Sequence, residues 1–315
     1  MQTNIYNNSD IGLNHGLAGE AFLYLIMGKK TGNKILQMHG ELALDSVGSK
    51  LANYSDFSFS NGIVGIGWMI EFCAQNGLLK IDSDDILEDV DDKIYQVTLI
   101  TLSKNLAEFT EILDLITYYE LRLLKKNSGA HYYRRFTHLE CLILLIEYCQ
   151  KKLEINILSK NNDKKHFNEV ALVLLKFSHL TSKGFSDTHF EDIFYESMEF
   201  FITHFEPLRL LYLEHLPEAP DIVELYMLLC MTARQYNNPY WISELELCYK
   251  QLQKEFSSHT NKGSDFCEKI ALMELIFHEP VINENLFNSI VGNQKHTELL
   301  TFYLSNYQPF SLGLI

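Results

Sequence analysis

The chain has 315 residues, of which 47% are hydrophobic and 21% are charged, a balance typical of a globular protein with a large core. Its 26 lysines and arginines against 41 aspartates and glutamates leave a net charge of −15. This charge argues against nucleic acid and against an anionic membrane surface as partners. A basic or unstructured segment of a peptide or protein suits such a surface better.

The sequence predicts a cytoplasmic protein. Its N-terminus lacks the basic region and apolar run of a signal peptide, and no apolar stretch is long enough to span a bilayer. The cysteines are scattered, mostly within apolar helical patterns, and we expect free thiols in a reducing compartment. The six are Cys73, Cys141, Cys149, Cys230, Cys248 and Cys267.

Two glycine-rich repeats open the chain. Gly12–Gly19 and Asn61–Trp68 each place two small residues three apart at the start of an apolar helical pattern, with a period of 46 residues (62 minus 16). Such a period is typical of repeated helical hairpins. A glycine at a helix start lets the backbone approach a neighbour or bind a group through free amides. The glycines concerned are Gly16 and Gly19 in the first repeat and Gly62 and Gly65 in the second.

The rest of the chain continues as helical hairpins. No useful length alternates with period two, so we predict an all-α chain whose residues 1–315 form a single domain. All six prolines follow residue 206 and lie near proposed helix boundaries. The predicted pairs are 16–28 with 33–52, 62–76 with 83–104, 108–126 with 136–153, 166–181 with 188–205, and 220–235 with 239–256. Further helices are predicted over 265–278, near 284–291 and over 295–305.

The helix over 83–104 begins with an acidic run. Ser83 is its predicted N-cap, and the acids of its first turn favour the positive end of the helix dipole. A calcium-binding loop needs a central glycine that this run lacks, so we interpret the acids as a solvated face. The predicted buried stripe of this helix is Ile86, Val90, Ile94 and Val97.

The glycine repeats and the acidic helix after the second repeat resemble the lanthionine synthetase C-like (LanC-like) family over roughly residues 12–150. The resemblance implies an α/α toroid of about six hairpins with an incomplete seventh. Enzymes of this family hold zinc with two cysteines and a histidine, and they add peptide cysteines to dehydrated serine or threonine. Zinc lowers the pKa of the attacking thiol.

The chain departs from the family where the chemistry should lie. Leu216 or Pro217 stands at the first zinc cysteine, and Cys267-Glu268 stands where the family has Cys-His. One thiol and one carboxylate do not make a conventional zinc site, so we expect no zinc cofactor, with Cys267 and Glu268 as remnant positions. The resemblance points to His166 as the catalytic histidine. His138 is the other candidate, and Ser58, with Asp56 nearby, stands at the family's aspartate.

Other candidates have plainer explanations. His15 precedes Gly16 and is expected to bond backbone or water, and Glu20 with Glu71 is too loosely spaced to indicate a glycosidase pair. The abundant aromatic residues fit core packing, although an aromatic-lined groove would suit a peptide. The leading hypothesis is a degenerate LanC-like protein that binds a precursor peptide or modifying enzyme without cyclisation of its own. A divergent cyclase using Cys267 and His166, and an unrelated helical scaffold, are the alternatives; an oligomer is possible.

Overall fold

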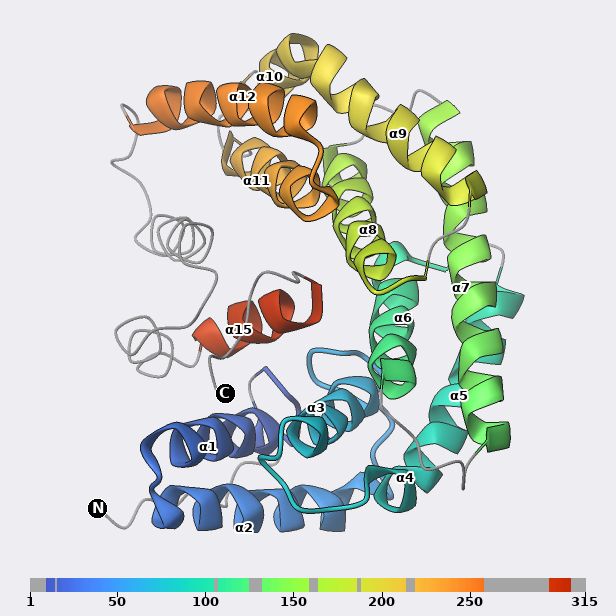
Figure 1. Ribbon diagram of the computed structural model, residues 1–315, viewed down its shortest axis with the longest axis vertical. Helices are drawn as coiled ribbons and strands as arrows, with labels where there is room; N and C mark the ends of the chain where they lie inside the picture. The colour runs from blue at the N-terminus through green and yellow to red at the C-terminus, as the bar shows by residue number, and fades with distance from the viewer. Residues whose placement is uncertain are drawn as a thin grey trace. The chain divides into compact units, whose positions relative to one another are not determined.

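The computed structural model describes residues 10–14, 16–104, 107–124, 132–158, 164–185, 188–213, 219–257 and 295–306 (Figure 1). Throughout these ranges the secondary structure is helical and no strand occurs, which confirms the predicted all-α class. The predicted helices over 265–278 and near 284–291 lie outside the described residues. The chain folds into two compact units, each of which is described by itself below.

The helix bounds agree with the predicted ranges to within three residues, except in three places. The predicted helix over 83–104 is divided at Leu87 into α4 and α5, and the additional helix α10 follows α9 directly. The helix predicted over 136–153 is longer, starting four residues earlier and ending five residues later. The helices are α1 (Leu17–Thr31), α2 (Lys34–Leu51), α3 (Ile63–Gln75), α4 (Ser83–Ile86), α5 (Glu88–Ser103), α6 (Phe109–Leu124), α7 (Tyr132–Leu158), α8 (Lys164–Ser182), α9 (Thr188–Thr203), α10 (Phe205–Leu213), α11 (Ala219–Tyr236), α12 (Pro239–Ser257) and α15 (Lys295–Asn306).

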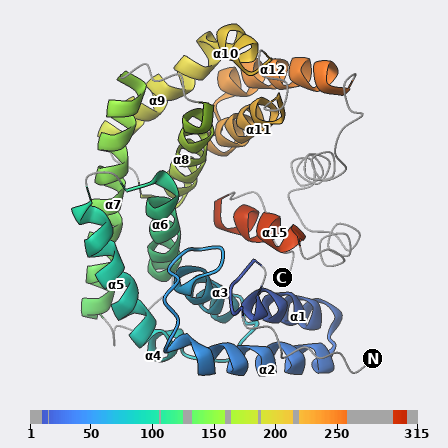
Figure 2. The same cartoon turned by 180° about the vertical axis from the view of Figure 1, so that it is seen from behind.

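The first unit comprises residues 1–148, 284–305 and 313–315. In it α1 and α2 form a close hairpin, and α3 packs against both α1 and α6, as both ribbon views show (Figures 1 and 2). The first helices of successive hairpins are therefore neighbours. Phe22 of α1 meets Trp68 and Phe72 of α3 edge to face, and these buried rings pack the two helices together.

The second unit comprises residues 149–283 and 306–312 and repeats this arrangement. The first helices of two successive hairpins, α8 and α11, pack on each other, and α12 lies against both α11 and α9. The turn between α11 and α12 uses Asn237 in the left-handed region, with φ 59°, and the Asn238 side chain accepts the amides of Tyr240 and Trp241.

Candidate functional site

A groove in the first unit is the principal candidate for a binding site. It has a volume of about 1080 Å³ and lies between α2 and the wall formed by α4 and α5, with residues of α3 also lining it. Leu44, Leu51, Ile70 and Ile81 contribute partly exposed apolar side chains, and half-exposed Ile86 adds another. A large, mostly apolar concavity with a few polar groups is the usual form of a ligand site.

The polar residues lining the groove are mainly acidic. Exposed carboxylates lie on both sides, on α2 and on α5, while Lys93 is held by a 3.1 Å hydrogen bond from its Nζ to the carbonyl oxygen of Ala52. Charged ligand groups that complement this rim are therefore cationic. The lining carboxylates are Glu41, Asp45, Asp89 and Asp92, and the lining ammonium groups are Lys80 and Lys93.

Gly48, which has no side chain, leaves free space on the α2 side of the groove. It lines the groove, and a Cβ placed on it would meet no atom within 4 Å. It lies one helical turn from Leu44 and Leu51, which line the groove too, so this face of α2 presents small and apolar groups to the space. A larger side chain at position 48 can therefore enter the groove without displacing its neighbours.

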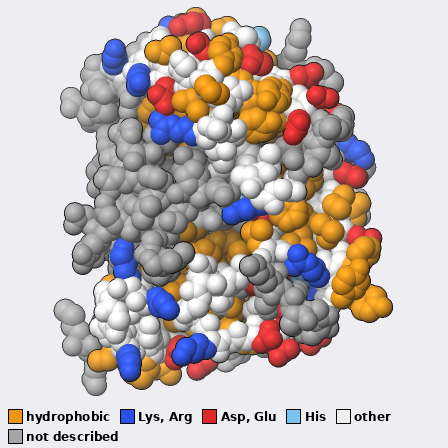
Figure 3. Space-filling model, in the orientation of Figure 1, with side chains coloured by type: hydrophobic (Ala, Val, Ile, Leu, Met, Phe, Trp, Pro, Cys, Tyr) orange, Lys and Arg blue, Asp and Glu red, His pale blue; other side chains and the backbone are white. Residues whose placement is uncertain are grey.

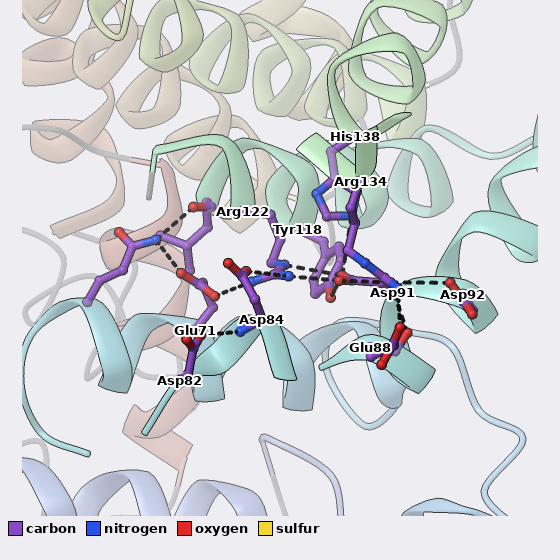
Figure 4. A network of polar contacts seen from close by, with 12 residues as sticks. Glu71, Asp82, Asp84, Glu88, Asp91, Asp92, Tyr118, Arg122, Arg134 and His138 are labelled. Atoms are coloured by element: carbon purple, nitrogen blue, oxygen red, sulfur yellow. Dashed lines mark hydrogen bonds and ion pairs between the residues drawn. The ribbon is translucent and has the colours of Figure 1, made fainter. Parts of the chain in front are cut away.

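The opposite side of the α4–α5 wall is held by Arg122 of α6 (Figure 4). The Nε and Nη2 atoms of this fully buried guanidinium donate to both oxygens of Asp91, at 3.1 and 2.7 Å. Its Nη1 lies 2.5 Å from Glu71 of α3, and its Nη2 lies 3.0 Å from Asp84 of α4. One side chain therefore joins α3, α4, α5 and α6. Bidentate arginine–carboxylate geometry of this kind gives both strength and specificity.

Tyr118 and residues of α7 complete the contacts of Asp91. The Tyr118 hydroxyl donates to Asp91 at 2.5 Å, and the Nε2 of His138 lies 3.4 Å from the same carboxylate. Burial by itself raises the pKa of Asp91, but the hydrogen bond from His138 and the charge of Arg122 outweigh it and lower this pKa to about 2. Asp91 is thus an anion held in place by its neighbours, and His138 is one of the residues that stabilise it.

The cluster corrects the interpretation of the acidic run as a wholly solvated face. Asp84 and Asp91 are buried, whereas other acids of the run are exposed. The predicted stripe is also wrong at Ile86, which is 51% exposed and lines the groove. The predicted N-cap is wrong as well, because Asp82 caps α4 by accepting the amide of Asp84. Glu71, weighed as one of a carboxylate pair, is bound to Arg122.

The glycine repeats lie at the starts of α1 and α3 in this unit. α1 and α3 begin directly after Gly16 and Gly62, and a Cβ on Gly65 would lie 1.7 Å from the carbonyl oxygen of Phe59. The first amides of α1, up to Gly19, donate to the carbonyls of residues 10–12. The glycines therefore permit close backbone packing, and the α1 amides bind the chain itself.

Asp114 of α6 is a titratable residue that the sequence interpretation missed. Its Oδ2 accepts the amide of Phe59 at 2.8 Å, in the loop that leads into α3. Burial, helped by the nearby carboxylates of Asp56 and Glu111, raises the pKa of Asp114 to about 7 against the opposing hydrogen bond from Phe59. Ser58, expected at the family's aspartate, instead accepts the amide of Asn61 through its hydroxyl.

The other predicted site residues are not brought together in the described part of the chain. His166 is the third residue of α8 and is half-buried, whereas His15, Leu216, Pro217, Cys267 and Glu268 lie outside the described residues. Burial raises the pKa values of the Cys73, Cys149 and Cys230 thiols well above their usual range. Within the described ranges, no three histidine, cysteine or acidic side chains converge on a point that could hold a metal ion.

Comparison of the chain with protein-family models, with curated proteins and with solved structures finds no match. Among the helices that the structure describes, none combines the length and the apolar character needed to cross a membrane.

Proposed function

We propose that this protein binds a peptide segment in the groove between α2 and the α4–α5 wall, as a non-catalytic, LanC-like component of the maturation of a ribosomally made peptide in the cytoplasm. The observation that carries the proposal is the groove itself, with its apolar lining and acidic rim. The glycine repeats support the family assignment, and the neighbouring first helices of successive hairpins support an α/α toroid.

The lining residues indicate the chemistry of the segment. Apolar side chains of the peptide would lie against Leu44, Leu51 and Ile86, and its lysines or arginines would lie near Asp45 and Asp89. Apolar burial supplies most of the affinity, whereas the charges at the rim mainly supply specificity and a faster association rate. A basic, amphipathic segment meets both requirements, and the net charge of −15 attracts it over a longer range.

The experiment uses two synthetic probes with the same apolar pattern, a fluorescent Leu/Lys peptide and a Leu/Glu peptide of equal length. Fluorescence anisotropy should show saturable binding of the Leu/Lys peptide, weakened by salt, and weaker binding of the Leu/Glu peptide. Gly48→Trp should reduce affinity at least about tenfold, equivalent to about 1.4 kcal/mol, by filling the groove. Gly48→Ala is the matched control and should bind like the wild type.

Three results would contradict the proposal. If Gly48→Trp leaves the affinity for the Leu/Lys peptide unchanged, the peptide binds outside the groove. If the Leu/Lys and Leu/Glu peptides bind with equal affinity, the acidic rim has no role in recognition. Thioether formation in a dehydrated, cysteine-containing peptide, lost on His166→Ala in a folded variant, would replace a binding role by the divergent-cyclase alternative.

A further inference from the structure

The outer face of α7 carries an exposed apolar stripe in the first unit. Tyr132, Phe136, Leu139 and Ile143 are 67%, 49%, 38% and 46% exposed. Their spacings of four, three and four residues place them on one side of the helix. Figure 3 shows hydrophobic side chains gathered along the edge of the molecule where α5 and α7 lie in Figure 1.

The opposite face of α7 explains why the stripe points outward. His138, Cys141, Leu142 and Leu145 are buried, and Arg134 reaches Glu88 and Asp92 of α5 at 3.0 and 3.2 Å. These contacts fix the rotation of the helix about its own axis. The stripe is therefore held outward by packing and ion pairs on the inner side, and its exposure is a fixed feature of this face.

The spacing of the stripe is that of a coiled-coil seam. A repeat of four and three residues assigns Tyr132 and Leu139 to d positions and Phe136 and Ile143 to a positions. A seam of this kind is complementary to another helix, and β-branched residues at a with leucine at d favour two parallel strands. Ile143 and Leu139 follow this preference. The occupant that the stripe fits is therefore a parallel helix.

The charges beside the stripe identify that helix. Arg135 takes the g position on one flank and Glu140 the e position on the other, and both are exposed. In a parallel pair, a g residue faces the e residue five positions later on the partner helix. Arg135 of one copy therefore faces Glu140 of a second copy, and the two-fold axis repeats the contact in reverse.

We propose that two copies of this protein associate through parallel α7 helices, with the stripe as the seam and two Arg135–Glu140 contacts across the dimer axis. From Tyr132 to Ile143 the seam is about 18 Å long at 1.5 Å per residue. The short seam makes a reversible dimer rather than an obligate one. This interface is independent of the peptide groove, which lies between α2 and the α4–α5 wall.

Charge-swap variants test the proposal by sedimentation velocity over a range of protein concentrations. Arg135→Glu and Glu140→Arg should each weaken dimerisation about tenfold, because each places two like-charged contacts across the axis. The double variant Arg135→Glu/Glu140→Arg should restore wild-type dimerisation. Leu139→Asp should give monomers at every concentration tested. Circular dichroism verifies that each variant keeps its helical content.

Ile35→Asp is the matched control, because Ile35 is an exposed apolar residue on α2, 62% exposed, and the change should leave the dimer intact. A wild-type protein that stays monomeric at hundreds of micromolar would overturn the proposal. A dimer that survives Leu139→Asp would overturn it as well. A double variant that dimerises no more tightly than the two single variants would also overturn it, because the helices would then not meet in the parallel register.

Discussion

Replacing Arg122 by methionine tests whether the buried charge cluster holds the wall of the groove. Methionine keeps much of the volume of the side chain but removes the charge that contacts Glu71, Asp84 and Asp91 together. These three carboxylates are almost completely buried, so water cannot replace the lost contacts. Removing one partner of a buried ion pair costs about 3–5 kcal/mol.

That loss is large compared with the whole stability of a typical protein, about 5–15 kcal/mol. Urea denaturation at pH 7 should therefore show a clearly lower midpoint for Arg122→Met. Arg122→Lys should lose less, because an ammonium keeps the charge but cannot bind both oxygens of Asp91 as the guanidinium does. Adding Asp91→Asn to the methionine variant should recover part of the loss, because one unpaired buried charge is removed.

The pH dependence distinguishes lost ion pairs from lost packing. In the wild type, the pKa of Asp91 is lowered to about 2, so its stabilising contribution is complete above pH 4 and is lost as the pH falls through 2. This shift corresponds to about 2 kcal/mol. Without Arg122 the Asp91 carboxylate takes up a proton more readily, and the deficit of the variant should shrink from pH 7 to pH 4. A methionine variant as stable as the wild type, or a deficit independent of pH, refutes this account.

Three further predictions concern other parts of the chain. The pKa of Asp114 is raised from 3.8 to about 7, so its burial should destabilise the fold as the pH rises from 4 to 7. In urea denaturation Asp114→Asn should be more stable than the wild type at pH 8 by roughly 2–4 kcal/mol, and this difference should shrink to about 1 kcal/mol near pH 4.5. Gly65→Ala should lower the free energy of unfolding by about 1–3 kcal/mol, because the new Cβ meets the Phe59 carbonyl. Gly48→Ala, at an open helix position, should raise it by up to about 1 kcal/mol. Thermal midpoints equal to that of the wild type would contradict both. Protein purified without chelators should contain no stoichiometric zinc by elemental analysis, and one tightly held zinc that disappears in Cys267→Ala would show that the zinc site is intact.

The helices were predictable from the sequence because their signals are local. Periodic apolar residues and turn-forming glycine and asparagine residues define most of the bounds, and Gly16 and Gly62 mark the starts of α1 and α3. The continuous stripe through Ile86 was wrong for a local reason. The backbone leaves the helix at Leu87, with φ −92° and ψ 7°, so α4 and α5 do not share one periodicity.

The charge cluster could not be predicted in the same way, because its members come from separate helices. Arg122 lies 31 residues from Asp91 and 51 from Glu71, and periodicity contains no information on which helices meet. One signal was present. Asp84 and Asp91 are seven residues apart, and Arg122 stands within the apolar pattern of α6, where an unpaired charge is costly. A charged residue in such a position indicates a buried partner.

The same sequence separations have a consequence for the order of folding. Contacts that close loops of 31 and 51 residues cost chain entropy before they return any stabilisation, so the Arg122 cluster should form after the local hairpins. Interactions absent from the folding transition state act mainly on the rate of unfolding. Arg122 should therefore set how long the assembled α4–α5 wall persists, and it should have little influence on how fast the chain first reaches its fold.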